Sequence, residues 1–240
     1  MNIYAFVVIG MVIGYLAGSI PFGLIVGKLF YKIDVRKYGS GNLGATNVAR
    51  NLGTKPGLLV LFLDLIKAGL PAMIMYFIAA ASITNNPDPL INSQSVYLSI
   101  VYCATGVFAC LGHCNPIFAG FKGGKAVASI AGFVLFMNWR ITLLAFFVFL
   151  LVALTTKIIS LASMSAMTVG AICIFIPFFT ESYLFTHGEL NNQLSRFIYF
   201  FSIILLALLL IYRHYPNIQR LLKGEEKKFK IEKIFKNDKK

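Results

Sequence analysis

Charged residues are scarce in this sequence of 240 residues, of which 13% are charged and 58% are hydrophobic. A soluble domain of this length would need far more charge to cover its surface. Acidic residues are rarer still, with 9 Asp and Glu against 22 Lys and Arg, so the formal net charge is +13. This scarcity excludes an ordinary water-soluble protein and favours a protein that lies in a membrane.

The sequence also lacks the features of a disulfide-stabilised or metal-binding protein. No basic residue precedes Lys28, so we expect the first apolar stretch to remain as a membrane span and not to be a cleaved signal peptide. The cysteines imply no disulfide framework, because all of them lie in or beside apolar segments: Cys103, Cys110, Cys114 and Cys173. Cys110, His113 and Cys114 have tempting spacings, but no fourth ligand is evident, so we expect no metal site.

Seven apolar segments could each cross a bilayer, which takes roughly 20 mostly apolar residues per helix. We expect spans at residues 3–30, 56–81, 96–111, 126–137, 141–155, 161–179 and 196–212. The segment 126–137 is short for a span and could be tilted or half-buried. We expect residues 18–21 to loosen the first helix, and Pro71 and Pro177 to loosen later ones, with the freed backbone groups satisfied inside the bundle. The sequence therefore predicts an all-α integral membrane fold of seven transmembrane helices, with one membrane domain over residues 1–228 and a basic tail over 229–240.

The basic residues are distributed unequally between the two sides of the predicted membrane domain. They concentrate in the loops 31–55 and 112–125, in the turn at Lys157 and in the tail from Arg213. The opposite loops hold only these charged residues: Asp88, Arg140, Glu181, Glu189 and Arg196. By the positive-inside rule, the N-terminus lies outside and the C-terminus lies in the cytoplasm. The positive charge then faces anionic membrane lipid, and we expect no nucleic acid as a partner.

The segment 39–50, GSGNLGATNVAR, is the densest in glycine and polar residues. Its G-x-G-x-x-G pattern is not a dinucleotide-binding signature, because a membrane span precedes it where that signature needs a strand. Glycines let a backbone approach a ligand, and consecutive N–H groups in a turn can form an anion-binding nest. The candidate phosphate-binding residues are Ser40, Gly41, Asn42, Thr46, Asn47 and Arg50. The alternative is a plain turn between two helices, which would not require five hydrogen-bonding side chains.

Further polar segments follow at the same predicted membrane face. Gly123, Gly124 and Lys125 precede an apolar helix, an arrangement that favours anions, although the lysines of this segment could equally be interfacial anchors. The residues 155–165 form a hydroxyl-rich turn that includes Ser160, a weak signal by itself. His214 and Asn217 lie one turn apart if the last helix continues past Pro216, which makes that continuation less certain.

Two ionisable residues lie within the second predicted span. Asp64 and Lys67 are three residues apart and can pair on one helix face. We expect a structural pair that supports the first loop and not a catalytic pair.

Taken in order, these segments resemble the PlsY family of bacterial acyl-phosphate:glycerol-3-phosphate acyltransferases. The resemblance covers nearly the whole chain and rests on GSIPFG, GSGNLGATNVAR, DLIKAGLPA, LGHCNPIFAGFKGGKA and RHYPNIQRLLKGEE. It implies seven spans in the bacterial inner membrane and an active site on the cytoplasmic side. It also implies transfer of an acyl group from acyl phosphate to the 1-hydroxyl of glycerol 3-phosphate, giving lysophosphatidate and phosphate in phospholipid biosynthesis. No cofactor or metal is implied, and an enzyme that forms acyl phosphate would be a possible upstream partner.

The resemblance also implies roles for particular residues. Ser40 and Arg50 match the family's essential pair, with Asn42, Thr46 and Asn47 beside them. Gly123, Gly124 and Lys125 match the segment tied to glycerol 3-phosphate binding, whereas Ser160, His214 and Asn217 match polar positions of the later motifs. Two positions depart from the family pattern: Asn115 replaces an apolar residue, and Ala126 replaces a glycine. We expect Ala126 to require a helical or extended backbone.

The residue types agree with transfer from an activated donor. The phosphate of an acyl phosphate leaves without a strong general acid, so the protein needs mainly to position two anionic substrates and to offset developing charge. The proton of the attacking hydroxyl must still go to a base, either His214 or a phosphate oxygen of the acyl phosphate, and the second is preferred. The rival classes are a transporter of phosphorylated metabolites, a soluble-substrate acyltransferase with a His-x4-Asp pair, which this sequence lacks, and a lipid scaffold.

Overall fold

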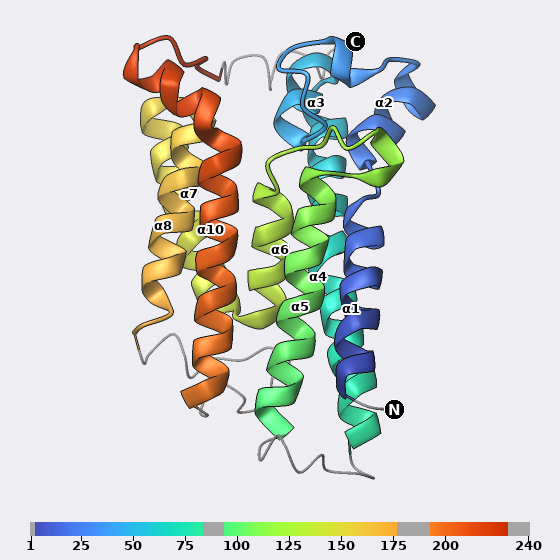
Figure 1. Cartoon of the computed structure of the whole chain (residues 1–240). Coiled ribbons are helices and arrows are strands. Elements are labelled where there is room, and N and C mark those ends of the chain that lie inside the picture. Colours follow the sequence, from blue (N-terminus) through green and yellow to red (C-terminus); the bar gives the residue numbers. More distant parts are fainter. Residues whose placement is uncertain (1–2, 84–93, 177–192, 230–240) are drawn as a thin grey trace.

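The computed structural model describes residues 3–83, 94–176 and 193–229, and this part of the chain is built from helices alone (Figure 1). The longer helices form a bundle: α1 (Ile3–Gly18), α4 (Thr54–Ile83), α5 (Gln94–Cys114), α6 (Val127–Met137), α7 (Trp139–Thr156), α8 (Ile159–Cys173) and α10 (Gln193–Leu222). The shorter helical elements are α2 (Phe22–Tyr31), η1 (Val35–Lys37), α3 (Ala45–Leu52) and η2 (Ile117–Ala119). The all-α prediction is confirmed. Several predicted features lie outside the described residues: Asp88, Pro177, Glu181, Glu189 and the tail residues 230–240.

The bundle has the length and the surface of a membrane domain. Within the described residues, the helical stretches long and apolar enough to cross a membrane are Tyr4–Tyr31, Thr54–Ser82, Gln94–Ala119, Trp139–Thr156 and Gln193–Leu222, and the first of these combines α1 and α2. The predicted spans at 126–137 and 161–179 correspond to the shorter apolar helices α6 and α8. The outer face of α7 exposes Phe146, Phe147 and Leu154, which lipid tails accommodate and water does not. The chain is therefore an integral membrane protein.

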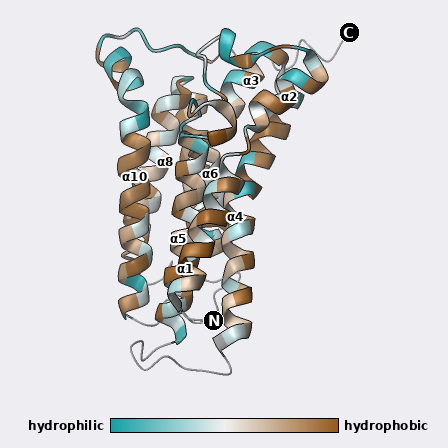
Figure 2. Ribbon diagram, turned by 45° about the vertical axis from the view of Figure 1, so that its right-hand side comes forward, coloured by the Kyte–Doolittle hydropathy of each residue, from teal (hydrophilic) through white to brown (hydrophobic). Residues whose placement is uncertain are grey.

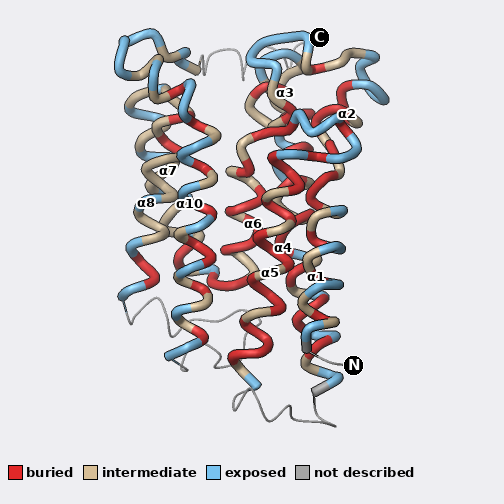
Figure 3. The backbone as a smooth tube through the Cα atoms, in the orientation of Figure 1, coloured by how far each residue is buried: buried red, intermediate tan, exposed pale blue. Residues whose placement is uncertain are grey.

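Close contact between α1 and α5 forms one side of the bundle. Gly10, Gly14 and Gly18 lie one turn apart on α1, and a side chain at any of them would collide with Thr105 or Ala109 of α5. Small residues at four-residue spacing let two membrane helices approach until their backbones touch. This contact helps to bury α5, most of whose residues are buried inside the bundle (Figure 3).

The first span is interrupted where the sequence predicted a loosened helix, and a buried ion pair supports this break, whereas α4 continues through Pro71. The chain leaves α1 at Gly18 and re-enters a helix at Phe22, and within this break the carbonyl of Ile20 accepts from the Phe22 N–H at 3.1 Å. Lys67 Nζ donates to that carbonyl at 3.0 Å and lies 2.7 Å from Asp64 Oδ1, with both side chains buried. The predicted pair of Asp64 and Lys67 is confirmed, but its contact is with this break and not with the loop at 31–55.

Polar residues gather at one end of the bundle, which we call the polar end (Figure 2). It carries α2, α3 and the end of α10, and the C-terminal segment follows there. α10 continues through Pro216 to Leu222, so the interruption considered for this helix does not occur. Gly224, with φ 71°, then turns the chain back toward the bundle. The backbone N–H of Phe229 donates to the carbonyl of Lys157, which fixes the segment 223–229 across the polar end.

Candidate active site

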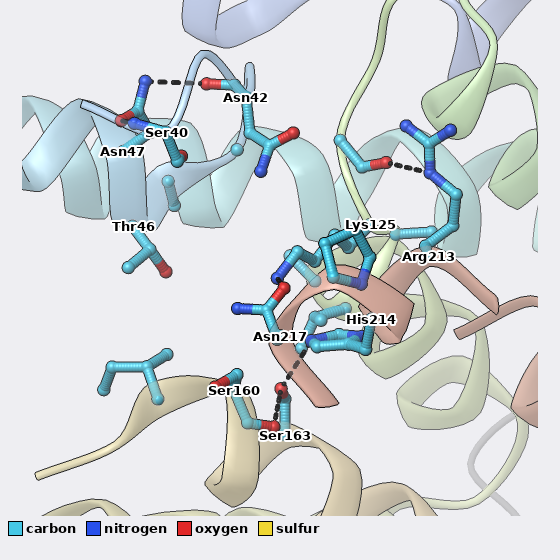
Figure 4. Close-up of a pocket in the computed structure, with 18 of the residues that line it drawn as sticks. Ser40, Asn42, Thr46, Asn47, Lys125, Ser160, Ser163, Arg213, His214 and Asn217 are labelled. Carbon is cyan, nitrogen blue, oxygen red and sulfur yellow. Dashed lines mark hydrogen bonds between the residues drawn. The ribbon is translucent and has the colours of Figure 1, made fainter. Parts of the chain in front are cut away.

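A cavity of about 800 Å³ opens at the polar end, between α3, the loop 120–126, the start of α8 and the end of α10 (Figure 4). It collects most of the residues selected from the sequence: Ser40, Asn42, Thr46, Asn47, Arg50, Gly124, Lys125, Ser160, His214 and Asn217. Gly41 and Gly123 are not among the lining residues. Residues as far apart in the sequence as Ser40 and Asn217 therefore meet at one site.

Three helix N-termini face this cavity. Its lining includes residues of the first turns of α3, α6 and α8, represented by Thr46, Val127 and Ser160. None of the three helices has a side-chain hydrogen bond at its N-cap residue. The first N–H groups of a helix have no helical acceptor, and the helix dipole places partial positive charge there. Together the three ends favour a bound anion, and phosphate is the common case.

Asn47 organises the loop that leads into α3. Its buried amide accepts from the Ser40 N–H at 2.8 Å through Oδ1. Its Nδ2 donates to the carbonyls of Val35, Tyr38 and Asn42 at 2.9–3.2 Å. Because both ends of the amide are used inside the loop, Asn47 shapes the loop, and contact with a substrate stays a prediction for this residue.

The N–H groups of Ser40 and Gly41 do not form the anion nest expected of the segment 39–50. The Ser40 N–H is bonded to Asn47, and the Gly41 N–H donates to the Tyr38 carbonyl at 3.0 Å. In the second loop, the Gly124 N–H donates to the His113 carbonyl at 3.1 Å. The expectation was wrong at these positions because each tight turn satisfies its own donors, and side chains and helix ends are left to meet the ligand.

Ser40, Thr46 and Arg50 stand at the rim of the cavity with their side chains unengaged. Ser40 and Arg50 are exposed, and Thr46 is half-buried. Within the described part of the chain, no hydrogen bond joins their hydroxyl or guanidinium groups to the protein. The charge of Arg50 nevertheless acts on Lys125 on the other side of the cavity. These three groups can therefore bind a ligand without first releasing an internal partner.

The second loop is packed tightly against the end of α5. A side chain at Gly123 would collide with the backbone at His113, and one at Gly124 would collide with the His113 ring itself. His113 lies 3.6 Å from Asp64, so the ring is held between this loop and the buried ion pair of α4. The two glycines are therefore required by packing, whatever they contribute to binding.

Ala126 differs from its expected conformation. It has φ 58° and ψ 15° at the N-cap of α6, which is the left-handed region, so the expectation of a helical or extended backbone was wrong. The turn from Lys125 into α6 requires this geometry, and an alanine there costs on the order of 1 kcal/mol. The other departure from the family pattern, Asn115, is exposed and contributes its backbone carbonyl to a 2.9 Å hydrogen bond from Tyr15.

A chain of polar contacts forms the opposite wall of the cavity. Lys125 Nζ donates to Asn217 Oδ1 at 2.6 Å, and Asn217 Nδ2 donates to Glu226 Oε1 at 2.6 Å. Ser160 Oγ donates to the same carboxylate oxygen at 2.7 Å, and Arg220 Nε donates to Oε2 at 2.7 Å. Burial raises the pKa of Glu226, but the hydrogen bonds outweigh this and lower it, so the carboxylate is ionised at neutral pH.

The pKa of the Lys125 ammonium group is lowered. Burial is the largest cause of the decrease of its pKa to about 8, and the guanidinium groups around the cavity add to it, whereas the Glu226 carboxylate opposes it. The ammonium group is therefore mostly charged at neutral pH, and it begins to lose that charge within one pH unit above.

His214 is fully buried between two partners. Its Nδ1 lies 2.8 Å from the Leu210 carbonyl, which can only accept, so Nδ1 carries a proton. Its Nε2 lies 3.1 Å from Ser163 Oγ, whose hydroxyl also reaches the Ser160 carbonyl at 3.0 Å. The imidazole is 1% exposed, so its free nitrogen faces Ser163 and has little room for a substrate hydroxyl.

Sequence reasoning missed several residues of this site: Ser163, Arg213, Arg220 and Glu226. In the sequence, Arg213 and Arg220 are not distinguished from the other basic residues of the tail, and Ser163 is one hydroxyl among several. Glu226 had two detectable signals, a glycine two residues earlier that permits a reversal of the chain and its rarity among basic neighbours. Its partners could not be read from the sequence, because Ser160 lies 66 residues away.

The fold and the site define an integral membrane protein with a cavity at the polar end that is rich in Arg, Lys and hydroxyl groups. A sequence model described as glycerol-3-phosphate acyltransferase matches residues 8–224. The chain is 37% identical over 229 residues to the glycerol-3-phosphate acyltransferase of Acholeplasma laidlawii, with 95% of each chain covered. The chain belongs to this family, which is that of PlsY, and is an integral membrane acyltransferase of phospholipid synthesis.

Solved structures agree with this assignment. The chain is similar to the crystal structure of PlsY (YgiH), an integral membrane glycerol 3-phosphate acyltransferase, in its glycerol 3-phosphate form. The TM-score is 0.74 at 35% identity, covering 96% of this chain and 99% of that one. The lysophosphatidic acid form of the same protein gives a TM-score of 0.72 at 34% identity, covering 95% and 97% of the two chains.

Proposed function

We propose that this protein transfers an acyl group from acyl phosphate to the 1-hydroxyl of glycerol 3-phosphate, giving lysophosphatidate and inorganic phosphate. The observation that carries the proposal is the cavity at the polar end, where three uncapped helix N-termini meet Arg50 and Lys125. Both substrates bring phosphate groups, which match this excess of positive charge. The related PlsY has been crystallised in glycerol 3-phosphate and lysophosphatidic acid forms, which supports the same acceptor and product here.

The reaction needs positioning and charge stabilisation more than acid catalysis. The hydroxyl oxygen of glycerol 3-phosphate attacks the acyl carbonyl carbon, the bond from that carbon to the phosphate oxygen breaks, and phosphate leaves with the electron pair. Arg50 and Ser40, unengaged at the rim, are the groups that would stabilise the developing negative charge. Lys125 and Asn217 would bind the phosphate of glycerol 3-phosphate, with Thr46 and Asn42 completing the polar lining.

The proton of the attacking hydroxyl goes to a phosphate oxygen of the acyl phosphate in this proposal. His214 is the alternative base, but its Nε2 faces Ser163 and its ring is buried. Its contacts suit a residue that holds α8 against α10. Replacing His214 with Ala would then leave substantial turnover at saturating substrate concentrations, and complete loss of turnover with intact folding would identify His214 as the base.

We further propose that the chain crosses the bacterial inner membrane seven times, with the N-terminus outside and the polar end in the cytoplasm. The basic residues of the loops and of the segment after α10 gather at the polar end, which supports this orientation. α6 and α8 would then be short spans that pack against longer helices. Labelling of single cysteines introduced at Lys37 and Lys223 with a membrane-impermeant reagent in intact cells tests it, since both positions should be protected until the membrane is opened.

The function is tested with purified protein in lipid vesicles supplied with acyl phosphate and labelled glycerol 3-phosphate. Formation of labelled lysophosphatidate supports the transferase. Accumulation of unmodified glycerol 3-phosphate inside the vesicles, without product, would support a transporter instead.

A further inference from the structure

Arg213 of α10 contacts the loop 120–126, which contains Gly123 and Gly124 and is called the glycine loop below (Figure 4). Its Nε donates to the Gly124 carbonyl at 3.0 Å, and its Nη2 donates to the Gly123 carbonyl at 3.2 Å. A guanidinium group presents donors in a rigid fork, so it can hold two consecutive carbonyls in one orientation, whereas a lysine ammonium cannot reproduce that geometry. Arg213 therefore fixes the direction of two successive peptide groups just before Lys125.

The same loop is held from its other side by α5. The Gly124 N–H donates to the His113 carbonyl at 3.1 Å, and the His113 ring occupies the space that a side chain at Gly124 would need. Because the Gly124 N–H and the Gly123 carbonyl belong to one planar peptide group, this hydrogen bond also orients the Gly123 carbonyl. The next peptide group, which carries the Gly124 carbonyl, is held by Arg213.

The end of the Lys125 side chain is held by the same helix that holds the loop. Its Nζ is bonded to Asn217, which lies four residues, or about one helical turn, after Arg213 on α10. One helix therefore holds both the backbone before Lys125 and the tip of its side chain. A hydrogen bond from a charged donor is stronger than one between neutral groups, so this contact helps to keep the flexible lysine in one place.

We propose that Arg213 is a positioning residue that holds the glycine loop so that Lys125 points its ammonium group into the cavity to bind the phosphate of glycerol 3-phosphate. This inference rests on the proposed function for the identity of the ligand. Arg213 acts through the loop in this account and does not itself hold the substrate.

The experiment compares the wild-type protein with Arg213→Lys, Arg213→Gln and Lys223→Gln in lipid vesicles. The control Lys223→Gln removes the same charge from an exposed side chain beyond the end of the same helix. Both Arg213 variants should raise KM for glycerol 3-phosphate by about tenfold, in line with the loss of one charged hydrogen bond, with kcat within about twofold. The control should leave both constants unchanged.

A second readout, which needs no enzymatic activity, follows the rate at which an amine-selective reagent modifies Lys125, measured by peptide mass spectrometry against pH. Release of the loop should make Lys125 react faster in both Arg213 variants. In Arg213→Gln the midpoint of the pH dependence should also move upward, because a positive charge that opposes protonation of Lys125 has been removed. Arg213→Lys keeps that charge, so its midpoint should move less.

These measurements separate the possible failures. Unchanged KM in both variants would overturn the inference, as would a fall in kcat without a change in KM. A raised KM with wild-type reactivity of Lys125 would also overturn it, because Arg213 would then contact the substrate directly. If no lysophosphatidate forms in the wild-type protein but Lys125 reactivity still depends on Arg213, the positioning role stands and the proposed function fails.

Discussion

The two walls of the cavity differ in how their polar groups are engaged. On the α3 side, Ser40, Thr46 and Arg50 have no hydrogen-bonded partners for their side chains in the described residues, and they stand at the rim. On the α10 side, Lys125, Asn217 and their neighbours form a continuous network that ends on Glu226. An unengaged donor can meet charge that develops during the reaction at little cost, whereas a networked donor is held in place before the substrate arrives. Under the proposed function, the first wall would stabilise the charge that develops in the reaction, and the second would position the substrate.

The largest effect should come from Arg50→Ala. Removing a donor that stabilises developing charge should lower kcat by roughly 10²–10³-fold. Arg50→Lys should recover only part of this, since one ammonium cannot replace a bidentate fork. Steady-state kinetics in vesicles measures the change, with Lys37→Ala, an exposed cation of the same loop, as the control. A rise in KM without loss of kcat would mean that Arg50 binds substrate, as the residues of the α10 side do, and the two walls would then not differ in role.

The next effect is a loss of activity at alkaline pH, caused by Lys125. Its pKa is lowered to about 8, so the ammonium is present below that pH and is lost above it. The ratio kcat/KM for glycerol 3-phosphate should fall by about tenfold per pH unit above about pH 8. In Lys125→Arg the side chain stays charged over this range, so the alkaline decrease should disappear. A decrease at the same pH in both proteins would assign it to another group.

Glu226→Ala should mainly affect stability. The carboxylate, 6% exposed, accepts hydrogen bonds from Ser160, Asn217 and Arg220, and their loss should cost about 2 kcal/mol, with the half-exposed Arg220 contributing least. Because the folded pKa is lowered, this stabilisation is complete above the unfolded pKa and is lost as pH falls through the folded pKa. Thermal unfolding in detergent at several pH values measures it, with the exposed Glu225→Ala as the control. Equal midpoints for the two variants would contradict the network.

The smallest effect should be a gain from Ala126→Gly. Glycine adopts φ 58° without steric cost, so this variant should be more stable by about 0.5–1 kcal/mol. Its activity should stay within about twofold of the wild type, because the turn keeps its shape. Thermal unfolding beside kinetics checks both, and a loss of stability would mean that the alanine methyl, which is fully buried, contributes more packing than its conformation costs.

The sequence predicted the long apolar helices and many of the polar residues that line the cavity, because both follow from local patterns. Long apolar runs, the break at Pro21 and polar motifs at one membrane face are visible without tertiary information. The left-handed Ala126, the continuation of α10 through Pro216 and the docking of Glu226 were not, because each depends on contacts between distant segments. The same holds for the loop N–H groups, since only the folded turns reveal that Asn47 and His113 already use them.

The central claim is tested most directly by the stoichiometry of the reaction with different acyl donors. Purified protein in vesicles receives labelled glycerol 3-phosphate with acyl phosphate or with an acyl thioester of the same chain length, and lysophosphatidate and inorganic phosphate are measured together. The account predicts one phosphate released for each lysophosphatidate formed from acyl phosphate, and no product from the thioester. Product from the thioester at a comparable rate, or phosphate release without lysophosphatidate, would contradict it.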